Sequence, residues 1–231
     1  VSVSVPKIAS AEADVPTPQT MPLAELIAHR GRELTAYQNG AYAKRYLDKV
    51  AKVASAEAIF GTETLTRAVA TNLYKLMAYK DEYEVARLYT DGRFAAERDG
   101  TFKGGKTKVW LAPPLLAAKD ADGKPRKIEF GGWMLDAAFP LLAKLKGLRG
   151  TPLDIFGASE ERKMERGLIA DYEAGLERLL AGLTAENLPL AVEIASAPQG
   201  VRGFGHIKEA SVKVAKADEA KLWAKWEKAP G

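Results

Sequence analysis

The chain has 231 residues, 47% hydrophobic and 28% charged, which suits one domain with a core of its own, or one domain plus an appendage. Because it has no cysteine, disulfides, thiolate metal sites and iron–sulfur clusters ligated by this chain are excluded. The formal charge of +4 is spread among 30 acidic residues, without the basic stripe typical of nucleic-acid binding. No apolar run is long enough to span a membrane and no stretch has the pattern of a secretory signal, so we expect a cytoplasmic protein.

The first 20 residues predict an extended arm that links this domain to a preceding one. Val and Ser alternate at the start of the stretch from Val1 to Ile8, as in an edge strand, and the residues that follow to Thr20 are small, polar and interrupted by prolines. The chain begins with Val1 rather than Met, which is consistent with a processed protein or with a segment of a longer one. We place the domain itself at residues 21–231.

Helical periodicity dominates that domain. A first helical region begins near Pro22 and runs to Ile59, and Gly40 is expected to kink it or to divide it in two. Further helices are expected over 94–98, from Gly132 to Gly147 with an interruption at Pro140, from Ser159 to Gly182, from Thr184 to about Ala195, and from His206 to about Lys228.

The stretch from Thr62 to Asp91 has the strongest pattern and predicts one long central helix. Its apolar positions fall on a single face that we expect to be buried. Lys80 and Arg87 project from the middle of that face, and Glu84 lies at its margin, one turn from each. Because a buried charge without a counter-charge is strongly destabilising, we predict that these three residues form an ionic cluster.

Two interpretations of this cluster stay open. In the first, Lys80 and Arg87 bind a carboxylate or phosphate of a substrate or cofactor. In the second, which we favour, the three charges form a structural ion network or a contact with another domain.

Two short strands are predicted between the helices. The stretches 106–111 and 127–130 are β-branched and aromatic, and Asp122-Gly123 between them is a strong turn signal. We predict a mainly α, multi-helix domain with one small β-hairpin-like strand pair and an extended N-terminal arm. Alternating β–α units are absent, so a parallel nucleotide-binding sheet is not expected.

A second group of candidate residues precedes the last helix. Gly203 and Gly205 free backbone N–H groups at a helix N-terminus, and together with Arg202, His206 and Lys208 they form a candidate site for a phosphate or carboxylate. The alternative is that the glycines permit a tight turn and that the histidine caps or packs. The glycine spacing is not that of the dinucleotide fingerprint.

Basic residues at positions 144, 146 and 149 follow another predicted helix, where they are expected to complement its dipole. No serine–histidine–acid arrangement and no metal-ligand spacing is present, so we predict no catalytic residue and no metal ligand in this chain.

Four segments occur in a specific order: LTRAVATNLYKLMAYKDEYEVARLYTD (65–91), WLAPPLLAAKDADGKPRKIEFGGWM (110–134), LAKLKGLRGTPLDIFG (142–157) and RGFGHIKEA (202–210). Together they resemble the C-terminal region of the long, fused indolepyruvate ferredoxin oxidoreductases, which are bacterial thiamine-dependent 2-oxoacid oxidoreductases. The resemblance covers about residues 23–225.

The resemblance implies a larger enzyme. That enzyme decarboxylates an aryl 2-oxoacid on thiamine diphosphate, forms an acyl-CoA and passes electrons through 4Fe-4S clusters to ferredoxin. Its thiamine motif and cluster cysteines have no counterpart here, so this chain is expected to hold no cofactor. The implied partners are the thiamine-binding and iron–sulfur domains of the parent enzyme, with ferredoxin indirectly, in an oligomer without nucleic acid or membrane.

The favoured hypothesis is a non-catalytic domain that serves structure and interdomain docking. An alternative is a ligand-contributing domain, in which Arg202, His206, Lys208 or Lys80 supplies positive charge to an anionic substrate or to CoA phosphates. A third hypothesis is a free-standing non-catalytic module.

Overall fold

The computed structural model of the protein describes residues 17–101, 108–111, 128–132 and 134–228. Within these ranges the chain forms nine α-helices and one two-stranded antiparallel sheet, which confirms the prediction of a mainly α domain with a small strand pair. Residues 1–16 of the predicted arm and the Asp122-Gly123 turn lie outside the described residues. The end of the arm forms a turn, and the guanidinium of Arg67 donates to the carbonyls of Pro18 (2.9 Å) and Met21 (2.8 Å) beside it.

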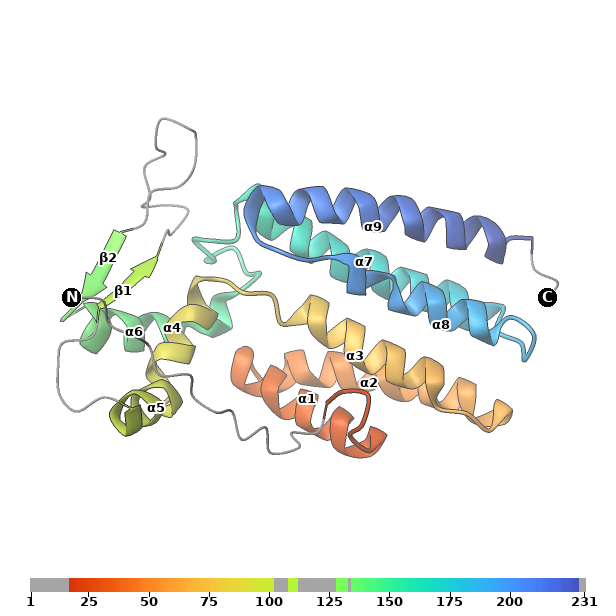
Figure 1. Ribbon diagram of the computed structural model, residues 1–231, viewed down its shortest axis with the longest axis horizontal. Helices are drawn as coiled ribbons and strands as arrows, with labels where there is room; N and C mark the ends of the chain where they lie inside the picture. The colour runs from red at the N-terminus through yellow and green to blue at the C-terminus, as the bar shows by residue number, and fades with distance from the viewer. Residues whose placement is uncertain (1–16, 102–107, 112–127, 133, 229–231) are drawn as a thin grey trace, which may run out of the picture.

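The helices are arranged in two bodies (Figure 1). The larger is an elongated bundle of α1 (Leu23–Tyr37), α2 (Gly40–Glu57), α3 (Thr64–Met77), α7 (Glu160–Ala181), α8 (Leu188–Ser196) and α9 (Gly205–Trp226). The smaller contains α4 (Glu82–Thr90), α5 (Arg93–Thr101), α6 (Phe139–Lys144), β1 (Lys108–Leu111) and β2 (Ile128–Gly131). Short helical turns join these elements: η1 (Ala58–Phe60), the π-helical η2 (Met134–Ala138), η3 (Leu145–Leu148) and η4 (Ala197–Gly200).

Helix α3 is the centre of the bundle and packs against α1, α2, α7 and α8. The side chains of Leu65, Val69, Leu73 and Met77 recur at helical spacing and are at most 1% exposed. Burying a side chain of this size stabilises the fold by about 1.5–3 kcal/mol. The predicted apolar face is therefore confirmed for this half of the central stretch.

The smaller body has a core of its own. In the register of the two strands Val109 is opposite Phe130, and both side chains are buried with Ala86 of α4 and Phe139 of α6. The rings of Phe130 and Phe139 lie 6.0 Å apart. Alternate residues of a strand point to opposite faces of the sheet. Val109 and Phe130 therefore lie on the face of the strand pair that packs against α4 and α6.

The prediction of one continuous helix from Thr62 to Asp91 is wrong. Helix α3 ends at Met77 and α4 begins at Glu82. Two tyrosines from the first helices bind the backbone at the break: the Tyr42 hydroxyl donates to the Met77 carbonyl (3.0 Å), and the Tyr37 hydroxyl donates to the Tyr79 carbonyl (2.8 Å). In a continuing helix these carbonyls would accept hydrogen bonds from backbone N–H groups. Here the two tyrosine hydroxyls donate to them instead.

Asp81 starts the new helix. Its Oδ1 accepts a hydrogen bond from the backbone N–H of Glu84 at 2.8 Å, which is the N-cap contact of α4. An N-cap aspartate followed three residues later by glutamate is a capping-box pattern, so the sequence does contain a signal for this helix start.

The Asp81 carboxylate also binds Arg149, which follows η3. The Arg149 guanidinium donates through Nε to Oδ2 at 2.5 Å and through Nη2 to Oδ1 at 2.8 Å, and both side chains are only 2% exposed. The same guanidinium donates to the Tyr37 carbonyl at 2.7 Å and stacks 3.7 Å from the centre of its ring. Burial, the largest single influence, lowers the pKa of Arg149, but the hydrogen bond to Asp81 and the electrostatic attraction of Asp81 and the nearby tyrosines together outweigh burial, so the pKa is raised.

The sequence predicted that the basic residues after α6 complement the dipole of the helix that precedes them. In the structure Lys146 and Arg149 complement the end of α1 instead. Lys146 donates to the Ala36 carbonyl at 2.5 Å, and Arg149 to that of Tyr37. Both carbonyls lie in the last turn of α1, where positive charge is favourable.

Glu57, at the end of α2, caps the start of α3 although its side chain is fully buried. One carboxylate oxygen accepts from the Thr62 hydroxyl, the Thr64 hydroxyl and the Leu65 N–H, and the other accepts from the N–H and hydroxyl of Thr66. Burial raises the pKa of Glu57, but these hydrogen bonds outweigh burial, so the pKa is lowered overall.

We expect Glu57→Gln to lower the free energy of unfolding by about 1–3 kcal/mol, because an amide cannot accept from all these buried donors. Since the folded pKa of Glu57 is below that of the unfolded chain, this stability is fully present above pH ~4.5 and is lost as pH falls through the folded pKa. Chemical denaturation at pH 7 and pH 3 measures both effects.

Glu63→Gln is the control, because that carboxylate stands exposed at the same helix start without a side-chain cap bond. An equal loss in the control would contradict capping by Glu57.

Replacing Arg149 by Met leaves Asp81 buried without its counter-charge, so we expect a loss of about 3–5 kcal/mol in the free energy of unfolding. Arg45→Met is the matched control. Arg45 makes the same bidentate contact, to Glu173 at 2.7 and 2.8 Å, but its side chain is 44% exposed, and we expect a loss below about 1 kcal/mol. Equal losses in the two variants would show that burial does not determine the strength of the Asp81 pair.

Candidate functional site

The structure separates the three residues of the predicted ionic cluster. Glu84 and Arg87 pair on α4, with nitrogen–oxygen distances of 2.8 and 2.7 Å and side chains 14% and 12% exposed. The hydrogen bond to Glu84 raises the pKa of Arg87. Lys80 lies in the break between helices and is exposed, and its ammonium group is 5.3 Å from the centre of the Phe204 ring. The cation on Lys80 therefore faces the start of α9 and does not join the pair on α4.

Gly203, before α9, and Gly205, its first residue, adopt the positive φ angles that a tight turn requires. Gly203 has φ 88°, and a Cβ there would lie 2.6 Å from a methyl carbon of Ile207, so a larger residue does not fit. The N–H of Gly205 donates to the Glu161 carboxylate at 3.1 Å, so a carboxylate of the same chain already occupies this part of the helix start. His206 is exposed and does not line the neighbouring pocket.

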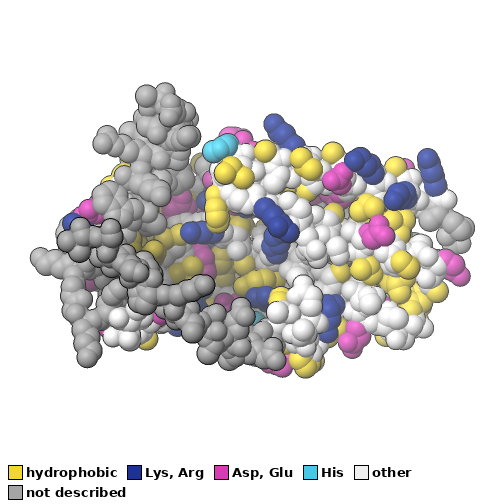
Figure 2. All heavy atoms as spheres, in the orientation of Figure 1, with side chains coloured by type: hydrophobic (Ala, Val, Ile, Leu, Met, Phe, Trp, Pro, Cys, Tyr) yellow, Lys and Arg dark blue, Asp and Glu magenta, His cyan; other side chains and the backbone are white. Residues whose placement is uncertain are grey.

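A pocket of about 400 Å³ lies between the end of α3, the first half of α7 and the segment that precedes α9. Four cations line it: Lys75 on α3, Lys80 in the break, Arg202, and Lys208 on α9. Among the described residues, the acidic side chain of its wall is that of Glu165 on α7. In Figure 2 basic side chains stand among apolar ones near the middle of this face of the molecule. The structure thus brings together Lys80, Arg202, Gly203 and Lys208 from the two predicted groups.

Glu165 neutralises one of the four cations. Lys208 donates to its Oε1 at 2.5 Å, and Arg162 binds its other oxygen. Burial raises the pKa of Glu165 even though both cations act in the opposite direction. The guanidinium of Arg162 also lies 3.9 Å from Glu82 and 3.9 Å from Glu161. These charges form a buried network beneath one side of the pocket.

The other three cations have no carboxylate within ion-pair distance in the described part of the chain. Lys75 donates to the carbonyls of Pro198 (2.8 Å) and Gln199 (3.2 Å), and Arg202 donates to the same Gln199 carbonyl at 3.3 Å. Partial burial lowers the pKa of Lys75, and repulsion from Arg202 and Lys208 lowers it further. The wall of the pocket therefore has an excess of positive charge.

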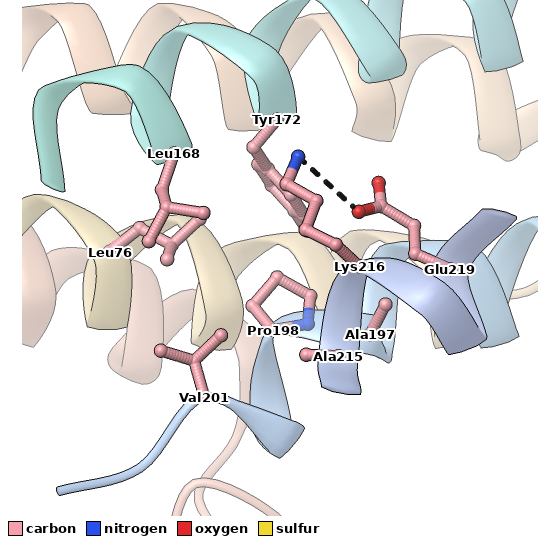
Figure 3. Close-up of a pocket in the computed structure, with 9 residues that line it drawn as sticks. All are labelled: Leu76, Leu168, Tyr172, Ala197, Pro198, Val201, Ala215, Lys216 and Glu219. Atoms are coloured by element: carbon pink, nitrogen blue, oxygen red, sulfur yellow. Dashed lines mark ion pairs between the residues drawn. The ribbon is translucent and has the colours of Figure 1, made fainter. Parts of the chain in front are cut away.

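An apolar crevice opens from the same region, and Figure 3 shows the side chains that line it. Leu76, Leu168 and Val201 line both the crevice and the larger pocket. The crevice measures about 20 Å³, room for about one water molecule. Lys216 and Glu219 pair at its edge, 3.5 Å apart. The larger pocket is therefore lined by both cations and apolar side chains.

The sequence prediction missed Lys75, Arg162 and Glu165. Lys75 lies in the central stretch, but Gln199, to which it donates, is 124 residues away along the chain. No local pattern joins residues so far apart. Arg162 and Glu165 are only three residues apart on α7, and that spacing was the available signal for an ion pair.

Within the described ranges no group of three His, Asp or Glu side chains is placed to hold a metal ion. None of the described helices combines the length and the apolar character needed to cross a bilayer.

A family model described as a family of unknown function, DUF6537, matches residues 23–221. No curated protein and no solved structure matches the chain. Because the match spans most of the sequence and nearly all the helices described above, the chain belongs to the DUF6537 family.

Proposed function

We propose that this chain is a non-catalytic docking domain of an indolepyruvate-type 2-oxoacid:ferredoxin oxidoreductase in the cytoplasm. The parent enzyme would supply thiamine diphosphate, 4Fe-4S clusters and CoA on other domains, and this domain would hold those domains in place within an oligomer. The resemblance of four ordered sequence segments to that enzyme supports the assignment to it.

One observation carries the docking role: the loop between η3 and α7 and the start of α9 expose large apolar side chains to solvent. Leu153 and Ile155, between η3 and α7, are 70% and 63% exposed. Phe204 and Ile207, at the start of α9, are 64% and 59% exposed. Figure 1 places this loop beside the starts of α7 and α9, at the end of the bundle that faces the smaller body. Exposed apolar side chains that gather in one region are typical of a protein–protein interface.

The loop is held by its own backbone contacts. Asp154 accepts hydrogen bonds from the N–H groups of Gly150 (2.8 Å), Phe156 (3.2 Å) and Gly157 (3.0 Å). The Tyr83 hydroxyl contacts Asp154 at 3.2 Å, and its ring meets Phe156 edge-on at 5.2 Å. A surface that is already ordered loses little conformational entropy when a partner covers it.

A second candidate function has separate support. The excess of cations around the pocket beside α9 favours a ligand-contributing domain, with Lys80, Arg202 and Lys208 as its positively charged residues.

The docking role is tested in the full-length oxidoreductase with the double variant Leu153→Ser, Ile155→Ser. We expect 2-oxoacid-dependent ferredoxin reduction to fall by about tenfold, the effect of losing about 1.4 kcal/mol of interdomain contact. The KM for the 2-oxoacid and the melting temperature should stay close to those of the wild type, because both side chains are exposed within this chain.

Ile59→Ser is the matched control. Ile59 is 81% exposed in η1, which joins α2 to α3 at the opposite end of the bundle. Unchanged ferredoxin reduction in the double variant, or an equal fall in the control, would contradict docking through the loop between η3 and α7, here called the 149–158 loop. A raised KM at unchanged turnover would favour the ligand-contributing role.

A further inference from the structure

We propose that the pocket lined by Lys75, Lys80, Arg202 and Phe204 binds a small phosphate monoester with a compact apolar body. The proposal rests on the pocket alone and is independent of the docking role of the 149–158 loop.

The wall of the pocket carries unbalanced positive charge. Lys208 is paired with Glu165, whereas Lys75, Lys80 and Arg202 face the pocket without a carboxylate partner among the described residues. The repulsion that these cations exert on one another is relieved when an anion enters. Elsewhere on the bundle, lysines such as Lys49 and Lys52 share the carboxylate of Glu177. The unbalanced charge around the pocket is therefore a local feature.

Three cations from separate segments of the chain line the pocket. Lys75 comes from α3, Lys80 from the break after it, and Arg202 from the segment before α9, and both Lys75 and Arg202 donate to the carbonyl of Gln199. A phosphate monoester offers about two negative charges and three terminal oxygens, which three separate cations can share. A single carboxylate has two oxygens and one charge, and it matches this wall less well.

Apart from its charged residues, the lining of the pocket is largely apolar. Leu76, Ala78, Leu168 and Val201 line it together with Phe204, whose side chain is 64% exposed. A volume of about 400 Å³ lies in the range of small-molecule sites. Because the crevice behind this wall holds only about one water, the apolar body of the ligand must lie in the main pocket.

The shape of the site distinguishes a small molecule from a macromolecule. A nucleic-acid surface needs cations spread along a face, and here the surrounding basic residues are interleaved with acidic ones (Figure 2). Gly203 lines the pocket with no side chain, and a Cβ at that position would collide with Ile207.

The test is calorimetric titration of the full-length protein at low salt with phenyl phosphate, inorganic phosphate and phenol. We expect phenyl phosphate to bind, inorganic phosphate to bind at least about threefold more weakly, and phenol to give no heat, because both halves of the ligand contribute. Lys75→Met and Arg202→Met should each weaken phenyl phosphate binding by about tenfold. Lys80→Met should weaken it too, and this side chain is exposed, so its loss leaves the fold intact.

Lys213→Met is the matched control, since Lys213 is an exposed lysine of α9 that does not line the pocket. Its affinity for phenyl phosphate should equal that of the wild type. Three results would overturn the proposal: no binding of phenyl phosphate at millimolar concentration, equal weakening by Lys213→Met, or unchanged binding in Arg202→Met and Lys80→Met. Equal affinity for inorganic phosphate and phenyl phosphate would overturn the role of the apolar wall.

Discussion

The buried contact between Arg149 and Asp81 is the constraint on which the rest of the structure depends. Both side chains are removed from water, so each charge requires the other at close range. Asp81 begins α4, and Arg149 stacks on Tyr37 at the end of α1. One ion pair therefore joins the bundle to the smaller body. It also fixes the break after α3, which supplies one wall of the pocket, and the start of the loop that exposes Leu153 and Ile155.

The cations of this chain fall into two groups. Arg87, Arg149, Arg162 and Lys208 have carboxylate partners and are mostly buried. Arg87 pairs within α4, whereas the other three have partners on other elements and hold these elements together. Lys75, Lys80 and Arg202 bind backbone carbonyls or an aromatic face, which leaves their charge available to a ligand. The cations with carboxylate partners stabilise the fold, and Lys75, Lys80 and Arg202 support the proposal that the pocket binds a ligand. Leu153 and Ile155 of the apolar loop do not line the pocket, whereas the exposed ring of Phe204 lines the pocket and also belongs to the apolar surface at the start of α9.

The break in the central stretch shows why periodicity misled the prediction. The apolar positions before and after the break keep helical spacing, and Tyr83 is buried as expected. Local capping by Asp81 and the hydroxyls of Tyr37 and Tyr42 nevertheless make ending α3 more favourable than continuing it. The capping pattern is visible in the sequence, but the tyrosine contacts join residues at least 35 positions apart.

The sequence by itself determined the helical class, the strand pair and several helix starts, because periodicity, turn residues and caps act over a few neighbouring residues. Ser159 caps α7 and the break before Gly40 divides the first helical region, both through such local contacts. Only the tertiary structure decided which charges meet. Lys75 and Arg202 reach the same carbonyl from positions far apart in the chain, and Arg149 finds Asp81 across 68 residues. Charge pairing depends on distance in space, and only packing of the whole chain sets that distance.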